Sequence, residues 1–461
     1  MPKNYQHTLS LVFAVKEINE NPKILPNITL GFHIYDSHFN AKMTYKNTLN
    51  LLFSQNRIVL NYLCDFQKNP VTVIGGINSE ISLHMAIILG IYKIPQVTYS
   101  LLTPAISDKT QLSSLYRMVP NEALQYNGIV QLLLFFQWKW VGIIAKNDPK
   151  GQEFVQTLEQ MFSKNGICIA FTATMPTEKN IAEFDDLMED LEDLTIFLIQ
   201  TRVNVCVVNA DEATFDLQFL VNMAESNALT PISKVWVMTA DWDFSSTVLH
   251  RDLNIQAFHG TLSFAIHSNE VQEFPSFLQS LNPHSDGDGF IMTFWEQAFN
   301  CFFPDIGVSK ESKGHCTGEE KLENLPGPFF EMDMTSQSYS IYNAVLAVAH
   351  ALHALYYTHT KEGPMVGREN QKPAMPQYIQ VIFHMEGRYS LLIDYCMSYY
   401  GVLSCISITT SSETVVFCLH SFRTKFIFSF SLSLSFFLSF IDYCIYIPLF
   451  LKGSFAAYSI L

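Results

Sequence analysis

The chain has 461 residues, with 43 acidic and 28 basic side chains and a formal charge of −15. This acidity argues against a nucleic-acid-binding protein, which would carry a basic patch or stripe. A hydrophobic content of 48% with only 15% charged residues excludes a disordered chain. The nine cysteines are too few for a small disulfide scaffold and too scattered for a CxxC metal site.

The first twenty residues predict an amphipathic helix. Leu9, Val12, Phe13 and Ile18 fit one face of such a helix. Charged and polar residues interrupt the apolar run that a secretory signal would need. We therefore expect the chain to begin within a folded element, with no signal peptide.

The body of the chain alternates predicted strands with predicted helices, which favours a parallel α/β architecture. The expected strands are residues 71–75, 94–99, 140–145, 167–173, 203–208 and 235–239. The expected helices are residues 79–90, 121–137, 151–164, 211–226, 270–281, 289–300 and 339–356.

The C-terminal residues have a different composition. Residues 426–441 read FIFSFSLSLSFFLSFI and carry no charge. This run is shorter than the ~20 residues that span a membrane as a helix, so a membrane segment is the weaker alternative. We expect residues 384–461 to be an atypical tail, from an incorrect gene structure or translated non-coding sequence, and we expect no seven-helix membrane domain.

The segment VTVIGGINSEISLHM carries the strongest local signal for a binding site. A strand ends at Gly75 and Gly76, and Asn78 or Ser79 can cap the helix that follows. The free N–H groups and positive dipole end of a helix suit an anion such as a carboxylate. An ordinary N-cap is the alternative interpretation of the same residues.

Several longer blocks carry a resemblance to a known family: NYQHTLSLVFAVKEINENPKILPNITLGFHIYDS, GGINSEISLHMAIILGIYKIPQVTYS, SDKTQLSSLYRMVPNE, DGFIMTFWEQAFNC and YSIYNAVLAVAHALHALY. From about residue 5 to about residue 383 the chain resembles the extracellular domain of class C G protein-coupled receptors. Within that class it is most similar to the vomeronasal type-2 (pheromone) receptors, which are related to the calcium-sensing and metabotropic glutamate receptors.

The resemblance implies a bilobed Venus flytrap similar to type I periplasmic binding proteins, with two parallel-sheet lobes. Lobe 1 would comprise residues 1–117 and 267–383, and lobe 2 residues 118–266. The third crossing between the lobes and the last strands of lobe 2 have no counterpart in the matching blocks. No cofactor or metal is implied.

The resemblance also implies a ligand site. Ser79, beside Asn78, matches a serine that holds the α-carboxylate of a bound amino acid. Ser100 follows a strand end and matches another ligand contact, and Glu122 matches an acid that faces the cleft. Glu122 has an equally good structural interpretation as an acidic residue that stabilises a helix N-terminus.

Other positions depart from the family pattern. Leu102 replaces a hydroxyl-bearing residue, and Lys150 falls where relatives have an aromatic residue. The acid that receives the ligand's ammonium falls on Ala240, with Asp241 next to it. The carboxylate end of the pocket is therefore better preserved than the ammonium end, which leaves a peptide or another small polar ligand open.

Two further features suit an extracellular module. Cys301 and Cys316 match a family disulfide, worth about 3 kcal/mol for a loop of this size; two free thiols are the alternative. Cys168 matches a cysteine whose partner lies in a domain absent from this chain, so it would be unpaired. The Asn27-Ile28-Thr29 sequon predicts glycosylation of Asn27.

Two metal-site interpretations are weaker. His350 and His353 lie three residues apart on one helix, but surface histidines explain them as well. The acidic run at residues 183–193 reads as the solvated face of an amphipathic helix.

Two other function classes compete with the receptor hypothesis. An α/β enzyme is disfavoured because no GxGxxG, GxxxxGK[ST] or HExxH motif occurs. A solute-binding protein of the same fold without a signalling role is the other alternative.

We interpret the chain as the ligand-binding domain of a vomeronasal type-2-like receptor and not as an enzyme. We expect it to face outward at the plasma membrane and to close on a small amino-acid-like or peptide cue. Its expected partners are a second receptor subunit and, through a membrane domain missing from this chain, a G protein; nucleic acid is not among them.

Overall fold

The computed structural model describes residues 2–38, 40–52, 70–76, 78–100, 112, 114–120, 122–175, 196–198, 200–209, 234–240, 260–284, 289–303, 314–326, 329–361, 404–409, 414–422 and 425–429. The described helices are α1 (Pro2–Glu20), α2 (Ala41–Leu52), α3 (Ser79–Ile91), α4 (Glu122–Phe135), α5 (Pro149–Asn165), α8 (Glu273–Gln279), α9 (Ile291–Phe299) and α10 (Ser336–Lys361), with the 3-10 helix η4 (Leu322–Asn324). The described strands are β1 (Val73–Ile74), β2 (Gln96–Thr98), β3 (Leu115–Arg117), β4 (Trp140–Lys146), β5 (Cys168–Met175), β6 (Val205–Asn209), β7 (Val235–Met238), β8 (Leu262–Ala265), β9 (Ser404–Thr409), β10 (Thr414–Phe422) and β11 (Lys425–Ser429).

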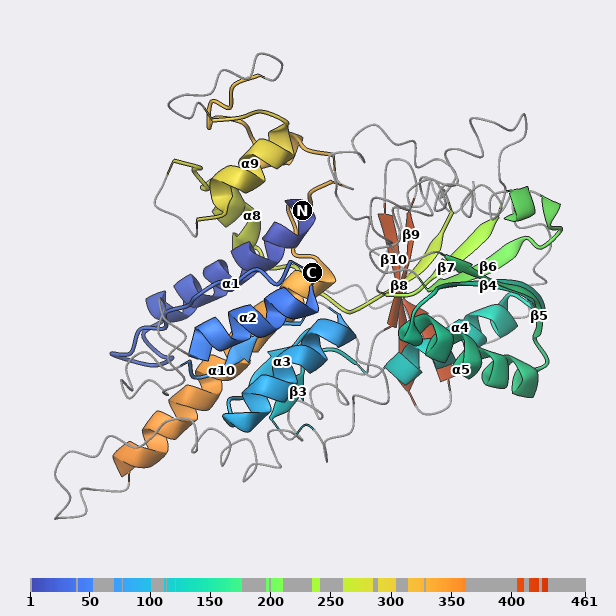
Figure 1. The fold of residues 1–461 in the computed structure, drawn as a ribbon, viewed down its shortest axis with the longest axis horizontal. Helices are drawn as coiled ribbons and strands as arrows, with labels where there is room; N and C mark the ends of the chain where they lie inside the picture. The colour runs from blue at the N-terminus through green and yellow to red at the C-terminus, as the bar shows by residue number, and fades with distance from the viewer. Residues whose placement is uncertain are drawn as a thin grey trace, which may run out of the picture.

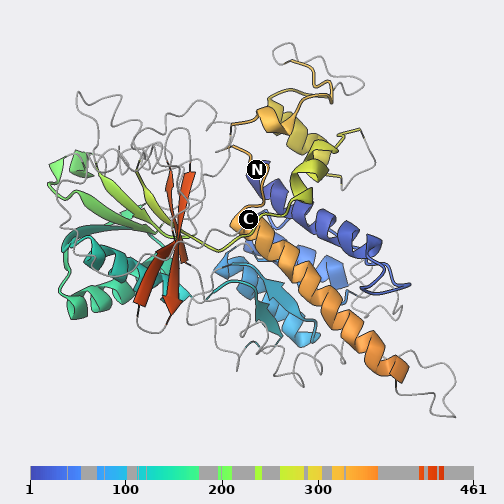
Figure 2. The same ribbon diagram turned by 180° about the vertical axis from the view of Figure 1, so that it is seen from behind.

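These elements form an α/β fold with two separate sheets. One sheet has the order β1-β2-β3, and the other has the order β11-β10-β9-β8-β7-β6-β4-β5. Strands β1 to β3 are mutually parallel, as are β4 to β8. Figures 1 and 2 show two groups side by side, with α4, α5 and the larger sheet in one and α1, α2, α3, α8, α9 and α10 in the other.

The predicted lobe boundaries can be placed on these elements. The boundary at 117–118 falls between β3 and α4, and the boundary at 266–267 falls just after β8. The division into lobes at these residues stays a prediction.

The larger sheet is built from strands with continuous apolar runs. All five residues of β6 are buried, and five of the seven residues of β4 are buried. Parallel strands with both faces covered have this pattern. Side chains of α4 and α5 pack with β4, β6, β7 and β8 in one core that includes Tyr126, Leu133, Ile143, Phe154, Phe162 and Val207.

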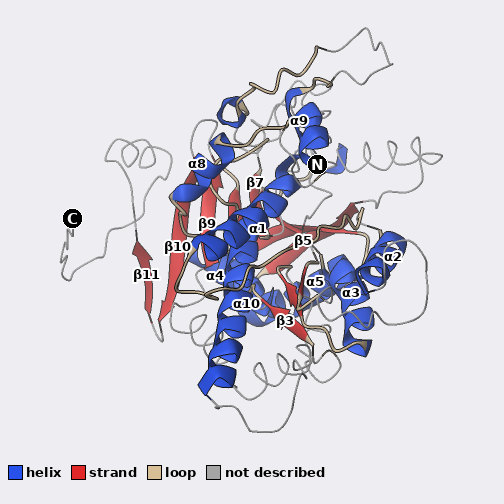
Figure 3. Ribbon diagram, turned by 90° about the vertical axis from the view of Figure 1, so that its left-hand side faces the viewer, coloured by secondary structure: helices blue, strands red, loops and turns tan. Residues whose placement is uncertain are grey.

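The other group is centred on α1 and α10, which lie against one another (Figure 3). Leu9, Phe13 and Ile18 are buried, while Val12 is half-buried. The amphipathic helix predicted from these residues is therefore confirmed. The buried Gln6 side chain of α1 joins it to the start of α10, accepting from Ser338 Oγ at 2.7 Å and donating to the Asp333 carbonyl at 2.8 Å.

Three strands near the C-terminus extend the larger sheet. β9 pairs antiparallel with β8, and β10 and β11 follow in antiparallel order. The resemblance offered no counterpart for the last strands of lobe 2; in the structure β9 pairs with β8, and β10 and β11 extend the sheet beyond β9. The non-coding origin of residues 384–461 stays a prediction. Of the Phe/Ser/Leu run, only residues 426–429 are described, within β11.

In the described part of the chain, no helix combines the length and apolar character needed to cross a bilayer. The predicted helix at 211–226 and the acidic run at 183–193 lie outside the described residues.

Candidate functional site

The N-terminus of α3 lies at the carboxyl end of β1, as the sequence predicts. Asn78 is its N-cap, with extended backbone angles, and the Asn78 side-chain oxygen accepts the Ile81 backbone N–H at 2.8 Å. Ser79 is therefore the first residue of the helix and not its cap. The Ser79 side chain is buried and already takes part in other interactions.

The turn before α3 depends on glycine. Gly76 has a φ of +100°, a backbone conformation that residues with a Cβ rarely adopt. A Cβ at Gly76 would also collide with the Ser82 side chain, which approaches from the first turn of α3. Glycine at position 76 therefore allows the β1–α3 turn to pack closely against the first turn of α3.

Three buried hydroxyls connect α3 to the end of β2. Ser82 Oγ lies 2.8 Å from Thr98 Oγ1 and 3.0 Å from Ser100 Oγ, and the latter two are 3.2 Å apart. Thr98 Oγ1 also lies 3.4 Å from the Gly76 carbonyl, in donating geometry. Ser100 thus lies at the α3 N-terminus as expected, but its hydroxyl holds the helix against the strand. Its predicted ligand contact stays a prediction.

Glu122 begins α4, and its side chain is fully buried. The Met118 N–H donates to the Thr98 carbonyl at 2.9 Å, and Met118 and Glu122 are only four positions apart in the sequence. Four residues span at most about 14 Å, so the start of α4 lies close to the end of β2. The carboxyl end of the small sheet and the N-terminus of α4 therefore lie in the same region of the molecule.

The sequence interpretation missed three polar residues at the carboxyl end of the larger sheet: Gln125, Asn209 and Thr239. Asn209 ends β6 and Thr239 follows β7, one residue beyond the paired Val208 and Met238. The Gln125 side-chain oxygen accepts the Ala240 N–H at 2.7 Å, which brings α4 to the same place.

These three side chains are 94% to 100% buried. Within the described residues, Gln125 Nε2, Asn209 Nδ2 and Thr239 Oγ1 have no hydrogen-bond partner. Buried polar atoms in native proteins are nearly always paired, so three together indicate a site that a polar ligand can complete. A polar residue at the end of one apolar strand, or directly after it, was the sequence signal that could have identified Asn209 and Thr239.

The remaining predicted contacts have separate outcomes. Asp241 and Leu102 lie outside the described residues. Lys150 lies in the first turn of α5 and is half-buried.

His353 Nδ1 accepts the Leu25 N–H at 3.0 Å, a structural contact between α10 and the segment after α1. Among the described residues, no three His, Cys, Asp or Glu side chains gather as a metal site.

The structure joins Cys301 to Cys316, the pair that the resemblance implies, with Cα atoms 5.1 Å apart. Cys168 is free and exposed. Asn27 is exposed in a turn with a φ of 65°, so the sequon is accessible; its glycosylation stays a prediction.

Comparison with known proteins identifies the family. Residues 6–387 match the family model described as "Receptor family ligand binding region". The chain belongs to this family. It is 32% identical to vomeronasal type-2 receptor 26 of Mus musculus over 355 residues, which cover 76% of this chain and 40% of that receptor. It is 28% identical to the extracellular calcium-sensing receptor of Homo sapiens over 386 residues, which cover 77% of this chain and 34% of that receptor.

The family match confirms the resemblance to class C receptor extracellular domains and the periplasmic-binding-protein-like fold class. A receptor ligand-binding region is not an enzyme, so the α/β-enzyme alternative is rejected. The chain spans 34% to 40% of the length of these relatives.

Proposed function

We propose that the chain is the ligand-binding domain of a vomeronasal type-2-like class C G protein-coupled receptor, facing the outside of the plasma membrane. Its ligand is a small amino-acid-like or peptide cue with a chemosensory meaning. The similarity to vomeronasal type-2 receptor 26 and to the calcium-sensing receptor supports this proposal.

The α3 N-terminus is the observation that carries the proposal. A parallel strand ends at a two-glycine turn, Asn78 caps the helix, and the buried Ser79 opens it. The helix dipole and the first-turn N–H groups favour a carboxylate at this point. The Ser82–Thr98–Ser100 hydroxyl triangle holds the helix in place, so the site is preorganised.

The Gln125, Asn209 and Thr239 group supports a second contact region for the same ligand. Because the Gln125 oxygen already accepts the Ala240 N–H, its NH2 group is the part left to bind a ligand. An NH2 group donates, so it matches a carbonyl, carboxylate or hydroxyl oxygen. A peptide or a polar amino acid carries such an acceptor in addition to its α-carboxylate.

Signalling would follow from a population shift between open and closed arrangements. A ligand that binds the closed arrangement better shifts the equilibrium toward it, and in a receptor dimer this closure would reorient the partner subunit. A shift from 1:99 to 99:1 requires about 5.5 kcal/mol of differential affinity. The G protein would be reached only through a membrane domain. A solute-binding protein without a signalling role would lack coupling between closure and dimer rearrangement.

The Ser79→Ala variant tests the site in cells that express a full-length receptor carrying this domain. The probes are the common L-amino acids, their glycyl dipeptides, and the methyl ester of each active compound. Loss of one hydrogen bond to a charged group costs about 1.5–3 kcal/mol, so we expect a ten- to hundredfold loss of potency. The methyl esters should be inactive because they lack the carboxylate charge.

Ser163→Ala, at an exposed position of α5, is the matched control. Surface expression is measured in parallel for every variant. If Ser79→Ala lowers surface expression but leaves the potency of the active probes unchanged, Ser79 has a structural role and the carboxylate site is wrong.

A further inference from the structure

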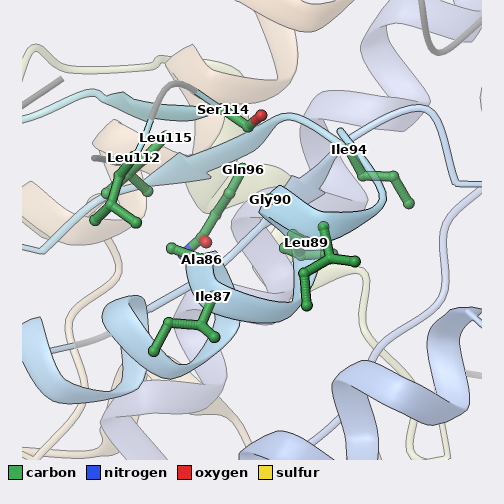
Figure 4. A pocket seen from close by; sticks show the side chains of 10 residues that line it. Ala86, Ile87, Leu89, Gly90, Ile94, Gln96, Leu112, Ser114 and Leu115 are labelled. Atoms are coloured by element: carbon green, nitrogen blue, oxygen red, sulfur yellow. The ribbon is translucent and has the colours of Figure 1, made fainter. Parts of the chain in front are cut away.

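A second site lies beside the helix that carries the first one. A pocket of about 350 Å³ opens between the second half of α3 and strands β2 and β3. Its walls are mainly apolar, and include Ala86 and Leu89 of α3, Ile94 before β2, and Leu112 and Leu115 at β3. Figure 4 shows the Gln96 side chain extending from β2 toward α3 among these residues. The volume is near the lower end of the range of about 300–1,000 Å³ for small-molecule sites.

The Gln96 amide gives this pocket a polar feature. The side chain is fully buried, and its Nε2 donates to the Ser82 carbonyl at 3.1 Å. A carbonyl can only accept, so this bond fixes the amide orientation and leaves Oε1 as the second polar atom. Within the described part of the chain, Gln96 Oε1 has no hydrogen-bond partner.

Another buried glutamine of the same chain, Gln6, shows the hydrogen bonding of an amide with a structural role. Gln6 donates to the Glu331 and Asp333 carbonyls and accepts from the Thr335 N–H and Ser338 Oγ, so both of its polar atoms are paired. Gln96 is equally buried, but only its nitrogen is paired. An acceptor in this state requires an N–H or O–H group, and the apolar wall around it favours an otherwise apolar molecule.

We propose that this pocket binds a small, largely apolar molecule that carries one N–H or O–H donor, and that the donor bonds to Gln96 Oε1. The site is separate from the α3 N-terminus and does not depend on the carboxylate proposal. It differs from that site in chemistry as well, because it presents an acceptor where the helix N-terminus presents donors.

Indole and benzofuran test the proposal on the purified full chain. The two molecules have nearly the same shape, but only indole has an N–H donor. We expect indole to bind about three- to tenfold more tightly by calorimetry, the ratio that one neutral hydrogen bond provides. Gln96→Met removes the acceptor with little change in volume, so the two probes should then bind equally.

Gly90→Leu is a second variant that does not disturb a buried bond. Gly90 lines the pocket, and a Cβ added to it meets no atom within 4 Å. Leucine is also a much better helix former than glycine, so the variant should fold and obstruct the entry of both probes. Gln156→Met, at an exposed position of α5, is the control for the methionine substitution.

The outcomes are distinct. The site is supported if indole binds more tightly than benzofuran, if Gln96→Met removes this difference, and if Gly90→Leu blocks binding. Equal binding of the two probes, no binding of either, or indole binding that Gly90→Leu leaves unchanged overturns it. If Gln96→Met does not fold, the indole-to-benzofuran ratio and the Gly90→Leu result decide the question.

Discussion

The side-chain oxygen of Gln125 accepts a hydrogen bond from the backbone N–H of Ala240 at 2.7 Å, and this contact joins α4 to the residues that follow β7. It fixes the direction of the Gln125 amide and places its NH2 group beside the carboxyl ends of β6 and β7. The resemblance places the acid that binds an ammonium group at Ala240, with Asp241 next to it, and the described residues around Ala240 provide amide and hydroxyl groups.

Thr239→Val tests whether this polar group serves a ligand. The Thr239 hydroxyl is fully buried and, among the described residues, has no partner. Since an unpaired buried polar atom costs about 1–3 kcal/mol, the isosteric valine should raise the free energy of unfolding by an amount in this range. In the receptor assay the same variant should lower ligand potency about three- to tenfold.

Thr44→Val is the matched control for that variant. Thr44 is also buried, but its hydroxyl donates to the Asn40 carbonyl at 2.9 Å. Its replacement should destabilise the chain by about 1 kcal/mol and leave potency unchanged. If both valine variants destabilise the chain equally in chemical denaturation, Thr239 is paired in solution and the subsite is not available.

Gly76→Ala should be among the most destabilising glycine substitutions in the described residues. It combines a positive φ, which costs about 1–2 kcal/mol, with overpacking against Ser82, which costs a further 1–3 kcal/mol. Gly260→Ala is the control, because Gly260 has a φ of +83° but nothing within 4 Å of an added Cβ. We expect the two thermal unfolding midpoints to differ, and equal midpoints would contradict the close contact between the turn and α3.

The Cys301–Cys316 bridge predicts a measurable contribution to stability. Opening a loop of this size should lower the free energy of unfolding by about 3 kcal/mol. Peptide mass mapping of secreted protein should find the two cysteines linked, and the Cys301→Ser, Cys316→Ser double variant should unfold at lower denaturant. Alkylation of both cysteines without prior reduction would contradict the bridge.

Glu320 predicts a loss of stability in acid. Burial opposes ionisation of this carboxyl, but hydrogen bonds from Thr317 and Trp295 outweigh it and lower its pKa from 4.5 to about 2. Because the folded chain releases this proton more readily than the unfolded chain, the contribution is complete above pH 4.5 and is lost as the pH falls toward 2.

Glu320→Gln should therefore reduce the change in the free energy of unfolding between roughly pH 5 and pH 2, the range in which the Glu320 carboxyl becomes protonated. Glu319→Gln, at the exposed neighbouring position, is the control and should leave the curve close to that of the native chain. Identical curves for the native chain and Glu320→Gln would show that the hydrogen bonds to the Glu320 carboxylate do not persist in solution.

The sequence pattern located the elements that have strong periodicity. The buried runs of β4 and β6 and the apolar face of α1 lie where hydrophobic spacing predicts them. It missed α2, whose buried positions include Thr44 and Thr48, because threonines give no apolar signal. It also missed β3 and β8, although it located β2 and β7, which have the same lengths.

The candidate site divides in the same way. Local chemistry predicted a helix beginning at residues 78–79 after two glycines, because strand ends, turns and caps are encoded by neighbouring residues. It could not choose between Asn78 and Ser79 as the cap; the backbone geometry decided for Asn78. It also could not show that Ser100 and Ser82 share a hydrogen bond at 3.0 Å across 18 positions of the sequence.

By itself, the sequence determined the α/β class, the family and the place of the α3 N-terminus, because those depend on hydrophobic spacing and on contiguous motifs. Only the tertiary structure brought Gln125 to Ala240, placed Asn209 and Thr239 beside it, and left the Gln96 oxygen without a hydrogen-bond partner among the described residues. The physical reason is that hydrogen-bond satisfaction depends on which groups meet across the fold. Whether a buried amide has a hydrogen-bond partner depends on residues that lie far away in the sequence. A local sequence pattern does not show which residues these are.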